Sequence, residues 1–255
     1  MKRWGLVVLG GVVVVAGLVY AALSVWSTDP CIVGERSCSR GNVCAKGVSP
    51  PYESARCVAA LPASHGTYAL PLLNPDGVIC TQSSQTPSGS HGYDNTLFAL
   101  DLSSPLKGPA GVVVAARAGT VIRAQARCTD PGRSGGYSDD CGQGFGNTVL
   151  IDHGDDTAAL YAHLAALEVA RGQRIARGAV VGREGITGSA GHRHLHFSVH
   201  AKRGALPLAG GMSWRAIPFR IRLREGAPTA RVQERDVRAL SCPHNKFDHA
   251  RWYTP

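Results

Sequence analysis

Two histidines one residue apart, His194 and His196, are the side chains of this chain best placed to do chemistry. The alternation around Phe197 and Val199 is typical of a β-strand, in which residues two apart point to the same face. The strand would therefore present two imidazoles side by side. Neutral imidazole is the commonest metal ligand and the usual proton carrier near neutral pH. The pair could supply both functions, although two surface histidines on an edge strand would give the same pattern.

A hydrolytic metal site needs about three protein ligands, an open position for water and a group that removes a proton from that water. The chain has no C-x-x-C pair, which argues against cysteine ligands. Two further stretches offer the side chains that remain. One leads from His91 to Asp101, and the other ends at His163. With the H-x-H pair, these stretches give a full set of candidate ligands and proton carriers.

These stretches resemble, in order, the lysostaphin-type (LytM-like) zinc metalloendopeptidases, which are peptidoglycan hydrolases. The likeness is carried by the following blocks: Ser90-His91 with 98–102, 113–121, 146–154, 161–164, and the glycine-marked turns from 172 to 188 before His194-Leu195-His196-Phe197. Together they cover about half of the chain, from about residue 80 to about residue 205. Each block alone is weak, but the combination is specific.

The resemblance implies that His91, Asp101 and His196 bind one zinc ion per chain and that His163 and His194 form the catalytic pair. One of the pair would take a proton from water and the other would steady the charge of the intermediate; which does which stays open. The implied activity is hydrolysis of peptide cross-links in peptidoglycan. The alternative is an inactive member of the family that binds cell wall or activates another hydrolase, and the complete set of five residues favours the enzyme.

Two departures from the family pattern lie close to these residues. Many members place the first His and the Asp four positions apart, whereas His91 and Asp101 are ten apart, and Asp94 is a second candidate ligand. We prefer Asp101 because the block 98–102 resembles that of long-spaced members. The second departure is the stretch Gly191-His192-Arg193 just before His194, where a Pro often precedes the histidine, and it concerns the shape of the loop.

Short strands are expected to hold these residues. The candidates are 96–102, 111–116, 119–124, 148–152, 158–162, 179–183, 194–200 and 217–223. Turns rich in Gly, Asp or Pro separate most of them, and only 164–172 hints at a helix. Many short strands with frequent turns predict an all-β fold, a small open barrel or sandwich of antiparallel strands, and the resemblance implies the same.

The N-terminal residues 1–27 predict a membrane anchor. Two basic residues precede an uncharged run from Gly5 to Trp26, which is long enough to span a bilayer as a helix. Positive charge on the short side predicts that the rest of the chain is exported. A cleaved signal peptide, with Ala21-Ala22 as its small-residue site, is the alternative. Both place the protein outside the cytoplasm: anchored in the inner membrane and facing the periplasm, or secreted if cleaved.

The rest of the chain divides into a Cys-rich segment and linker (28–70), the main domain with the candidate site (71–225) and a C-terminal extension (226–255). The net charge is +9, but the arginines are scattered rather than clustered. Together with export, this argues against a nucleic-acid partner and leaves anionic envelope polymers or a merely soluble basic surface. The sequence carries no pattern that indicates an oligomeric state.

Eight cysteines in an exported chain predict disulfides. Four lie between Cys31 and Cys57, in a segment with few large apolar residues that would depend on two bridges. Cys128 and Cys141 flank a Gly- and Ser-rich stretch and are expected to pair with each other. Cys80 and Cys242 are then left to join the two ends of the main domain.

Overall fold

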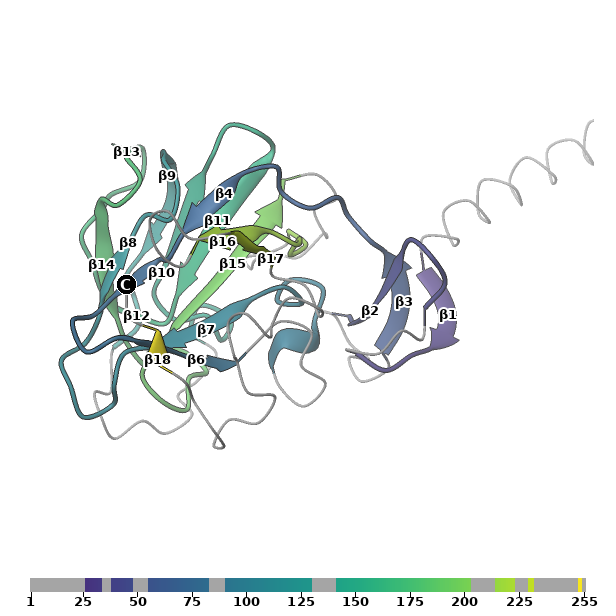
Figure 1. Cartoon of the computed structure of the whole chain (residues 1–255), viewed down its shortest axis with the longest axis horizontal. Helices are drawn as coiled ribbons and strands as arrows, with labels where there is room; N and C mark the ends of the chain where they lie inside the picture. Colours follow the sequence, from purple (N-terminus) through teal and green to yellow (C-terminus); the bar gives the residue numbers. More distant parts are fainter. Residues whose placement is uncertain are drawn as a thin grey trace, which may run out of the picture. The chain divides into compact units, whose positions relative to one another are not determined.

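The computed structural model describes residues 26–33, 38–47, 55–82, 90–129, 141–202, 214–222, 229–231 and 252–253. The chain divides into two compact units, Met1–Ala60 and Leu61–Pro255 (Figure 1). In the described part of the chain, no helix is long and apolar enough to cross a membrane. Residues 1–25 of the predicted membrane anchor lie outside the described residues.

The first unit is a three-stranded antiparallel sheet with two disulfides. Its strands lie in the order β1 (Trp26–Pro30), β3 (Ala55–Ala59), β2 (Asn42–Lys46). Its bridges are Cys31–Cys44 and Cys38–Cys57. The prediction of two bridges among these four cysteines is thus confirmed. They cross-link a sheet whose described buried apolar side chains are small, and in such a sheet cross-links do much of the work of a core.

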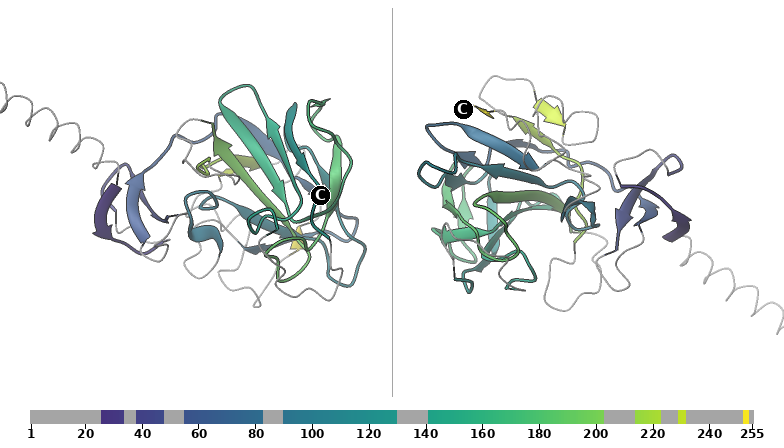
Figure 2. Two further views of the ribbon diagram at one scale, coloured as in Figure 1. Left: turned by 180° about the vertical axis from the view of Figure 1, so that it is seen from behind. Right: turned by 90° about the horizontal axis from the view of Figure 1, so that it is seen from below.

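The second unit contains an eight-stranded sheet in which all neighbours are antiparallel. Its order is β13 (Arg174–Ile175), β9 (Gly119–Gln125), β10 (Thr148–Asp152), β11 (Thr157–Ala162), β15 (Leu195–Ala201), β7 (Leu100–Ser103), β6 (Val78–Gln82), β18 (Trp252–Tyr253). The long strands β9, β10, β11 and β15 run side by side in Figure 1 and, seen from behind, in Figure 2.

Two smaller sheets and one helical turn make up the rest of the described part of this unit. One sheet has the order β12 (Leu164–Leu167), β14 (Val180–Glu184), β8 (Val112–Val114), β5 (Leu72–Leu73). The other has the order β17 (Thr229–Arg231), β16 (Arg220–Arg222), β4 (Thr67–Ala69). The pairing of β16 with β4 is the one parallel pair among the described strands. The turn is the 3-10 helix η1 (Ser90–Gly92).

The all-β prediction is confirmed, with open sheets and no closed barrel among the described strands. The hint of a helix over 164–172 is wrong, because this stretch begins with β12, which pairs with β14. The side chains of β12 do not alternate regularly between buried and exposed positions. The local sequence pattern was therefore ambiguous. Pairing with a neighbouring strand decided it.

The core packs against one face of β15. Leu195, Phe197 and Val199 belong to the main apolar cluster, and each is fully buried. Phe197 meets Tyr161 and Phe219 edge to face, with ring centroids 5.2 and 5.4 Å apart, a favoured geometry for aromatic pairs. Side chains alternate along a strand, and His196 lies between Leu195 and Phe197. Its side chain is therefore directed to the opposite face. Burial of the apolar face therefore sets the direction of the candidate ligand.

The second unit also contains the disulfide Cys128–Cys141, as predicted. Both cysteines lie between β9 and β10. Cys80 is disulfide-bonded as well. Its predicted partner, Cys242, lies outside the described residues.

Candidate metal centre

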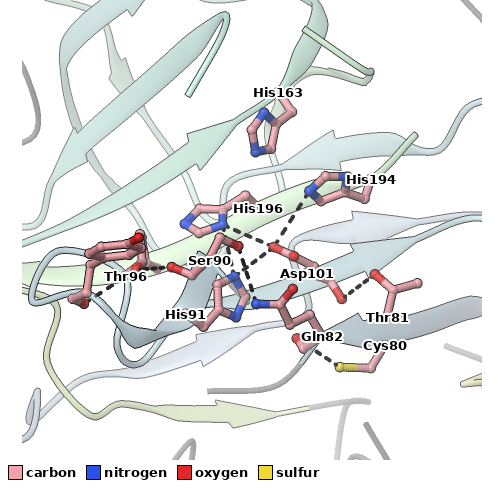
Figure 3. A network of polar contacts seen from close by, with 12 residues as sticks. Cys80, Thr81, Gln82, Ser90, His91, Thr96, Asp101, His163, His194 and His196 are labelled. Carbon is pink, nitrogen blue, oxygen red and sulfur yellow. Dashed lines mark hydrogen bonds and ion pairs between the residues drawn. The ribbon is translucent and has the colours of Figure 1, made fainter. Parts of the chain in front are cut away.

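Strand register brings the first two candidate ligands together. In the pairing of β15 with β7, His196 lies directly opposite Asp101, and in the pairing with β11 it lies opposite Ala162. Directly paired residues share a face of the sheet and lie about 5 Å apart at Cβ. The neighbour on β11 is thus a small residue, and Asp101 on β7 directs its carboxylate at the imidazole (Figure 3).

The third candidate ligand, His91, comes from η1 rather than from the sheet. The turn is fastened to the neighbouring strand β6, since the amide of Gln82 donates to the Ser90 hydroxyl at 3.3 Å. Three residues further on, Asp94 forms a buried ion pair with Arg215 at 3.1 Å. These contacts hold the loop so that the His91 side chain is completely buried.

The three side chains converge on one point. Nε2 of His91 lies 3.0 Å from Oδ1 of Asp101 and 3.2 Å from Nδ1 of His196, and Nδ1 of His196 lies 3.0 Å from the same carboxylate oxygen. All three residues are buried. Figure 3 shows both imidazoles directed at Asp101.

Hydrogen bonds alone do not satisfy the three converging atoms of His91, Asp101 and His196. If both imidazole nitrogens carry a proton, two N–H groups face each other across 3.2 Å; if one does, one nitrogen makes no bond to the carboxylate. A divalent cation would satisfy all three lone pairs at once. Zinc binds imidazole nitrogen and carboxylate oxygen at about 2.0–2.2 Å, so tetrahedral ligand atoms are about 3.3–3.5 Å apart. The observed separations of 3.0, 3.0 and 3.2 Å lie within a few tenths of this, and the donor set therefore fits zinc.

The carboxylate of this site is ionised. Burial by itself would raise the pKa of Asp101, but the neighbouring His91 and His194 and the hydrogen bond of His196 hold that pKa well below its usual range. Burial also lowers the pKa of His196, which favours its neutral form. A neutral imidazole beside a charged carboxylate is the protonation state that a metal ion requires.

His163, a predicted catalytic residue, follows β11 in an uncommon backbone conformation. Its φ is +61°, in the left-handed region that a non-glycine residue occupies at a cost of about 1–3 kcal/mol. The backbone N–H of His163 donates to the Phe145 carbonyl at 2.9 Å, and that of Leu164 donates to the Asn147 carbonyl at 3.1 Å. These bonds hold the strained residue so that its ring faces the ring of His194, with centroids 4.6 Å apart.

The loops around His163 approach so closely that two positions require glycine. A Cβ on Gly146 would lie 2.4 Å from the Thr187 carbonyl carbon and oxygen, and one on Gly188 would lie 2.4 Å from the Gly146 nitrogen. Both glycines also have positive φ. The close contact places the Thr187 carbonyl 2.7 Å from Nδ1 of His163.

Both predicted catalytic histidines have the same tautomer. A carbonyl oxygen only accepts hydrogen bonds, so Nδ1 of His163 carries a proton that it donates to Thr187. In the same way, Nδ1–H of His194 donates to the His192 carbonyl at 2.8 Å. In the neutral form of each ring, Nε2 is therefore the nitrogen without a proton, and Nε2 of His194 lies 3.7 Å from Oδ1 of Asp101. Burial, followed by the proximity of His194 and His196, holds the pKa of His163 well below its usual range.

The structure brings all five predicted site residues into one cluster and leaves the alternative ligand outside it. Asp94 is directed at Arg215, with an oxygen 3.2 Å from Nε and 3.1 Å from the terminal nitrogen. His192 stacks near His194, with ring centroids 4.9 Å apart. Thr187 was not singled out from the sequence, where a threonine between glycines carries no signal of a role in orienting a histidine.

His200 lies on the same strand but makes a separate pair of contacts. Its Nδ1–H donates to the Trp214 carbonyl at 2.9 Å, so Nε2 accepts from the Ser198 hydroxyl at 2.7 Å. Burial lowers the pKa of His200 from the usual 6.5 to about 4. These contacts indicate a structural histidine.

This pKa predicts a pH dependence of stability. Between pH 6.5 and 4 the unfolded chain binds a proton at His200 that the folded chain does not, so folding stability falls as the pH falls. We expect His200 to contribute roughly 3 kcal/mol to the loss of unfolding free energy between pH 7 and pH 4. Urea unfolding of the zinc-free protein measures it, with His200→Gln as the comparison. Equal losses in the two proteins would contradict the assignment.

Comparison with known proteins agrees with this geometry. Residues 99–207 match the model of peptidase family M23. The chain is 40% identical over 89 residues to the DD-carboxypeptidase/endopeptidase Mpg of Neisseria meningitidis serogroup B, and 34% identical over 74 residues to the peptidoglycan DD-endopeptidase ShyA of Vibrio cholerae. These matches cover 34% and 26% of this chain, but only 19% and 17% of the relatives.

Among solved structures, the chain is similar to the catalytic domain of lysostaphin from Staphylococcus simulans, with 19% identity and a TM-score of 0.36 over 54% of this chain and 84% of that one. A variant of the catalytic domain of the prophage-encoded protein EnpA from Enterococcus faecalis gives 19% identity and a TM-score of 0.40, over 58% and 92%. The family match includes Asp101, His163, His194 and His196. Residues 99–207 of this chain therefore form a peptidase M23 domain, of the LytM and lysostaphin family, and this domain carries four of the five clustered residues.

Proposed function

We propose that this protein is a zinc metalloendopeptidase that hydrolyses peptide cross-links of peptidoglycan. The observation that carries the proposal is the convergence of three lone-pair donors, from His91, Asp101 and His196, beside two imidazoles whose Nδ1 atoms are held by backbone carbonyls. Three protein ligands leave one position of a tetrahedral site open, as in catalytic rather than structural zinc sites. The names of the relatives support peptidoglycan as the substrate.

The residues divide the work as follows. His91, Asp101 and His196 would hold the ion, which when bound supplies Lewis acidity toward water and the scissile carbonyl. His194, with Nε2 3.7 Å from the ligand oxygen of Asp101, is placed to accept the proton of the attacking water at that nitrogen. The ring of His163 faces that of His194, with centroids 4.6 Å apart, and offers a second Nε2 for proton transfer; a ring that holds a proton at Nε2 is the one that can donate to the charge that develops on the carbonyl oxygen.

The fixed tautomers are part of this division. Because Nδ1–H of both rings is held by a backbone carbonyl, neither ring needs to reorient before Nε2 takes up a proton. The lowered pKa of His163 keeps that ring neutral at physiological pH. A histidine that accepts a proton from water can then pass it to the departing amine.

We also propose that the protein acts outside the cytoplasm, where peptidoglycan lies. The disulfides of both units support an oxidising compartment.

Digestion of purified sacculi and of defined cross-linked muropeptides tests the function, with products separated and identified by mass. We expect the zinc-loaded protein to cleave cross-links, a chelator to abolish cleavage, and added zinc to restore it. A zinc-loaded protein that binds sacculi but cleaves neither glycine-bridged nor directly cross-linked peptides would contradict the proposal and support a non-catalytic role.

A further inference from the structure

A buried ion pair lies beside the catalytic cluster and uses none of its five residues. Glu184, the last residue of β14, is completely buried, and its Oε1 lies 3.3 Å from Nε of Arg193. Arg193 directly precedes His194 and stands at the position where the sequence departs from the proline of the family pattern. Only 17% of its side chain is exposed.

Glu184 ties three segments of the chain together. Its Oε2 accepts the backbone N–H of Ser104 at 3.1 Å, and its Oε1 accepts the backbone N–H of Gly111 at 2.8 Å. The hydroxyl of Ser104 also donates to Oε1. A buried carboxylate with this many donors is well satisfied, and removing its charge would leave several donors without a partner.

Arg193 is fastened at both its side chain and its backbone. One terminal nitrogen donates to the Ser104 hydroxyl at 3.1 Å and to the carbonyls of Pro105 and Gly108 at 2.7 and 3.1 Å. The carbonyl of Arg193 accepts the Ser103 hydroxyl at 2.7 Å. The residue before the catalytic histidine is therefore fixed to the loop that follows β7.

A backbone hydrogen bond connects His194 to the same segment that carries Glu184. Gly185, next to Glu184, accepts the backbone N–H of His194 at 3.1 Å. The last residue of β14, Glu184, thus holds Arg193 through its side chain, and the next residue, Gly185, holds His194 through its backbone. The loop that anchors Arg193 continues from β7, the strand that carries Asp101. The contacts of Glu184 and Arg193 therefore connect β7, the strand that carries Asp101, to His194.

We propose that Glu184 and Arg193 are positioning residues that fix the ring of His194 relative to Asp101; the proposal rests on the proposed peptidase function. A buried ion pair by itself is weak ground for stability, since apolar replacements of similar volume are often neutral or stabilising. Its fitting role is geometric, because a displacement of about 1 Å in a catalytic group costs about 100-fold in rate.

Three variants separate positioning from folding: Glu184→Gln, Arg193→Met and the double variant Glu184→Gln/Arg193→Met. We expect each single variant to lower kcat about 10- to 100-fold, with KM changed less than about twofold and zinc still near one per chain. The double variant should be more stable than Arg193→Met, because no buried charge is left unpaired and the amide oxygen keeps an acceptor for the buried N–H groups, but it should not regain kcat. Lys202→Met is the matched control: it breaks the ion pair of Lys202 with Asp152 (2.6 Å), at the far end of β15, and should leave kcat unchanged.

A second measurement does not depend on activity. Long-range ¹⁵N NMR of the imidazoles should show His194 as the single Nδ1–H tautomer in the parent protein and as a mixture in Arg193→Met, because His192, whose carbonyl holds that proton, is then no longer fixed. A double variant that regains kcat together with stability, or an Arg193→Met spectrum identical to that of the parent, would overturn the inference. If the parent protein cleaves nothing while Arg193→Met still shows the mixture of His194 tautomers, the peptidase function alone would be contradicted.

Discussion

Replacing Asp101 by Asn is expected to strip zinc from the protein, while the same replacement at Asp94 leaves zinc bound. The Asp101 carboxylate contacts both imidazole ligand atoms at 3.0 Å and is ionised, so the substitution removes the one negative charge of the ligand set. Losing only an outer partner of a zinc ligand costs about 10- to 100-fold in metal affinity. Loss of a direct ligand should cost more, and hydrolysis should disappear with the metal.

The Asp94→Asn variant is the matched control, because both carboxylates are buried and lie three and ten residues after His91. Asp94 accepts from Arg215, and an amide oxygen can still accept there, so a stability loss of about 1–3 kcal/mol is expected without loss of metal. Zinc content after gel filtration, measured by mass spectrometry, and thermal unfolding distinguish the two effects. Zinc lost from Asp94→Asn but retained by Asp101→Asn would reverse the ligand assignment.

The second large effect is expected at the catalytic pair. His194→Ala and His163→Ala should each lower kcat about 100- to 10,000-fold, the range contributed by positioned acid–base groups, and leave zinc near one per chain. The reason is that neither ring belongs to the three converging ligands, while each has its Nδ1 held by a backbone carbonyl and its Nε2 left for proton transfer. If the two rings act as one unit, the double variant should be little slower than the slower single variant.

His200→Gln is the control for these substitutions, since His200 is a buried histidine of the same strand that contacts Ser198 and Trp214. It should lose stability and keep kcat. Turnover of a defined cross-linked peptide, together with zinc content, provides the measurement. A His194→Ala protein that turns over at the parental rate would remove His194 from the mechanism, and one that has lost zinc would make it a ligand.

The strand that carries His196 could be predicted because its signal is local. Alternation of Leu195, Phe197 and Val199 requires no knowledge of neighbours, and the structure places all three in the core. The Cys128–Cys141 bridge was predictable for a similar reason, since its two cysteines flank one short loop. The stretch 164–172 was misjudged because its strand is defined by pairing with β14.

The pairing of Glu184 with Arg193 carried no signal in the sequence. Two opposite charges nine residues apart in a region of turns are expected on the surface, and here both are withdrawn into the protein. The left-handed backbone of His163 was equally hidden, because it depends on bonds to Phe145 and Asn147 from a separate loop.

By itself, the sequence determined the residue types, the strand period and the order of blocks that identify residues 99–207 as a peptidase M23 domain. Local rules suffice for these features, because each depends on residues close together along the chain. Tertiary structure decided which carboxylate faces the imidazoles, which nitrogen of each catalytic ring carries the proton, and what holds His194 in place. These depend on strand register and on backbone carbonyls distant in sequence: Asp101 lies opposite His196 across two paired strands, and Asp94 faces Arg215. A one-residue slip in register would move the Asp101 carboxylate to the other face of the sheet and dismantle the site.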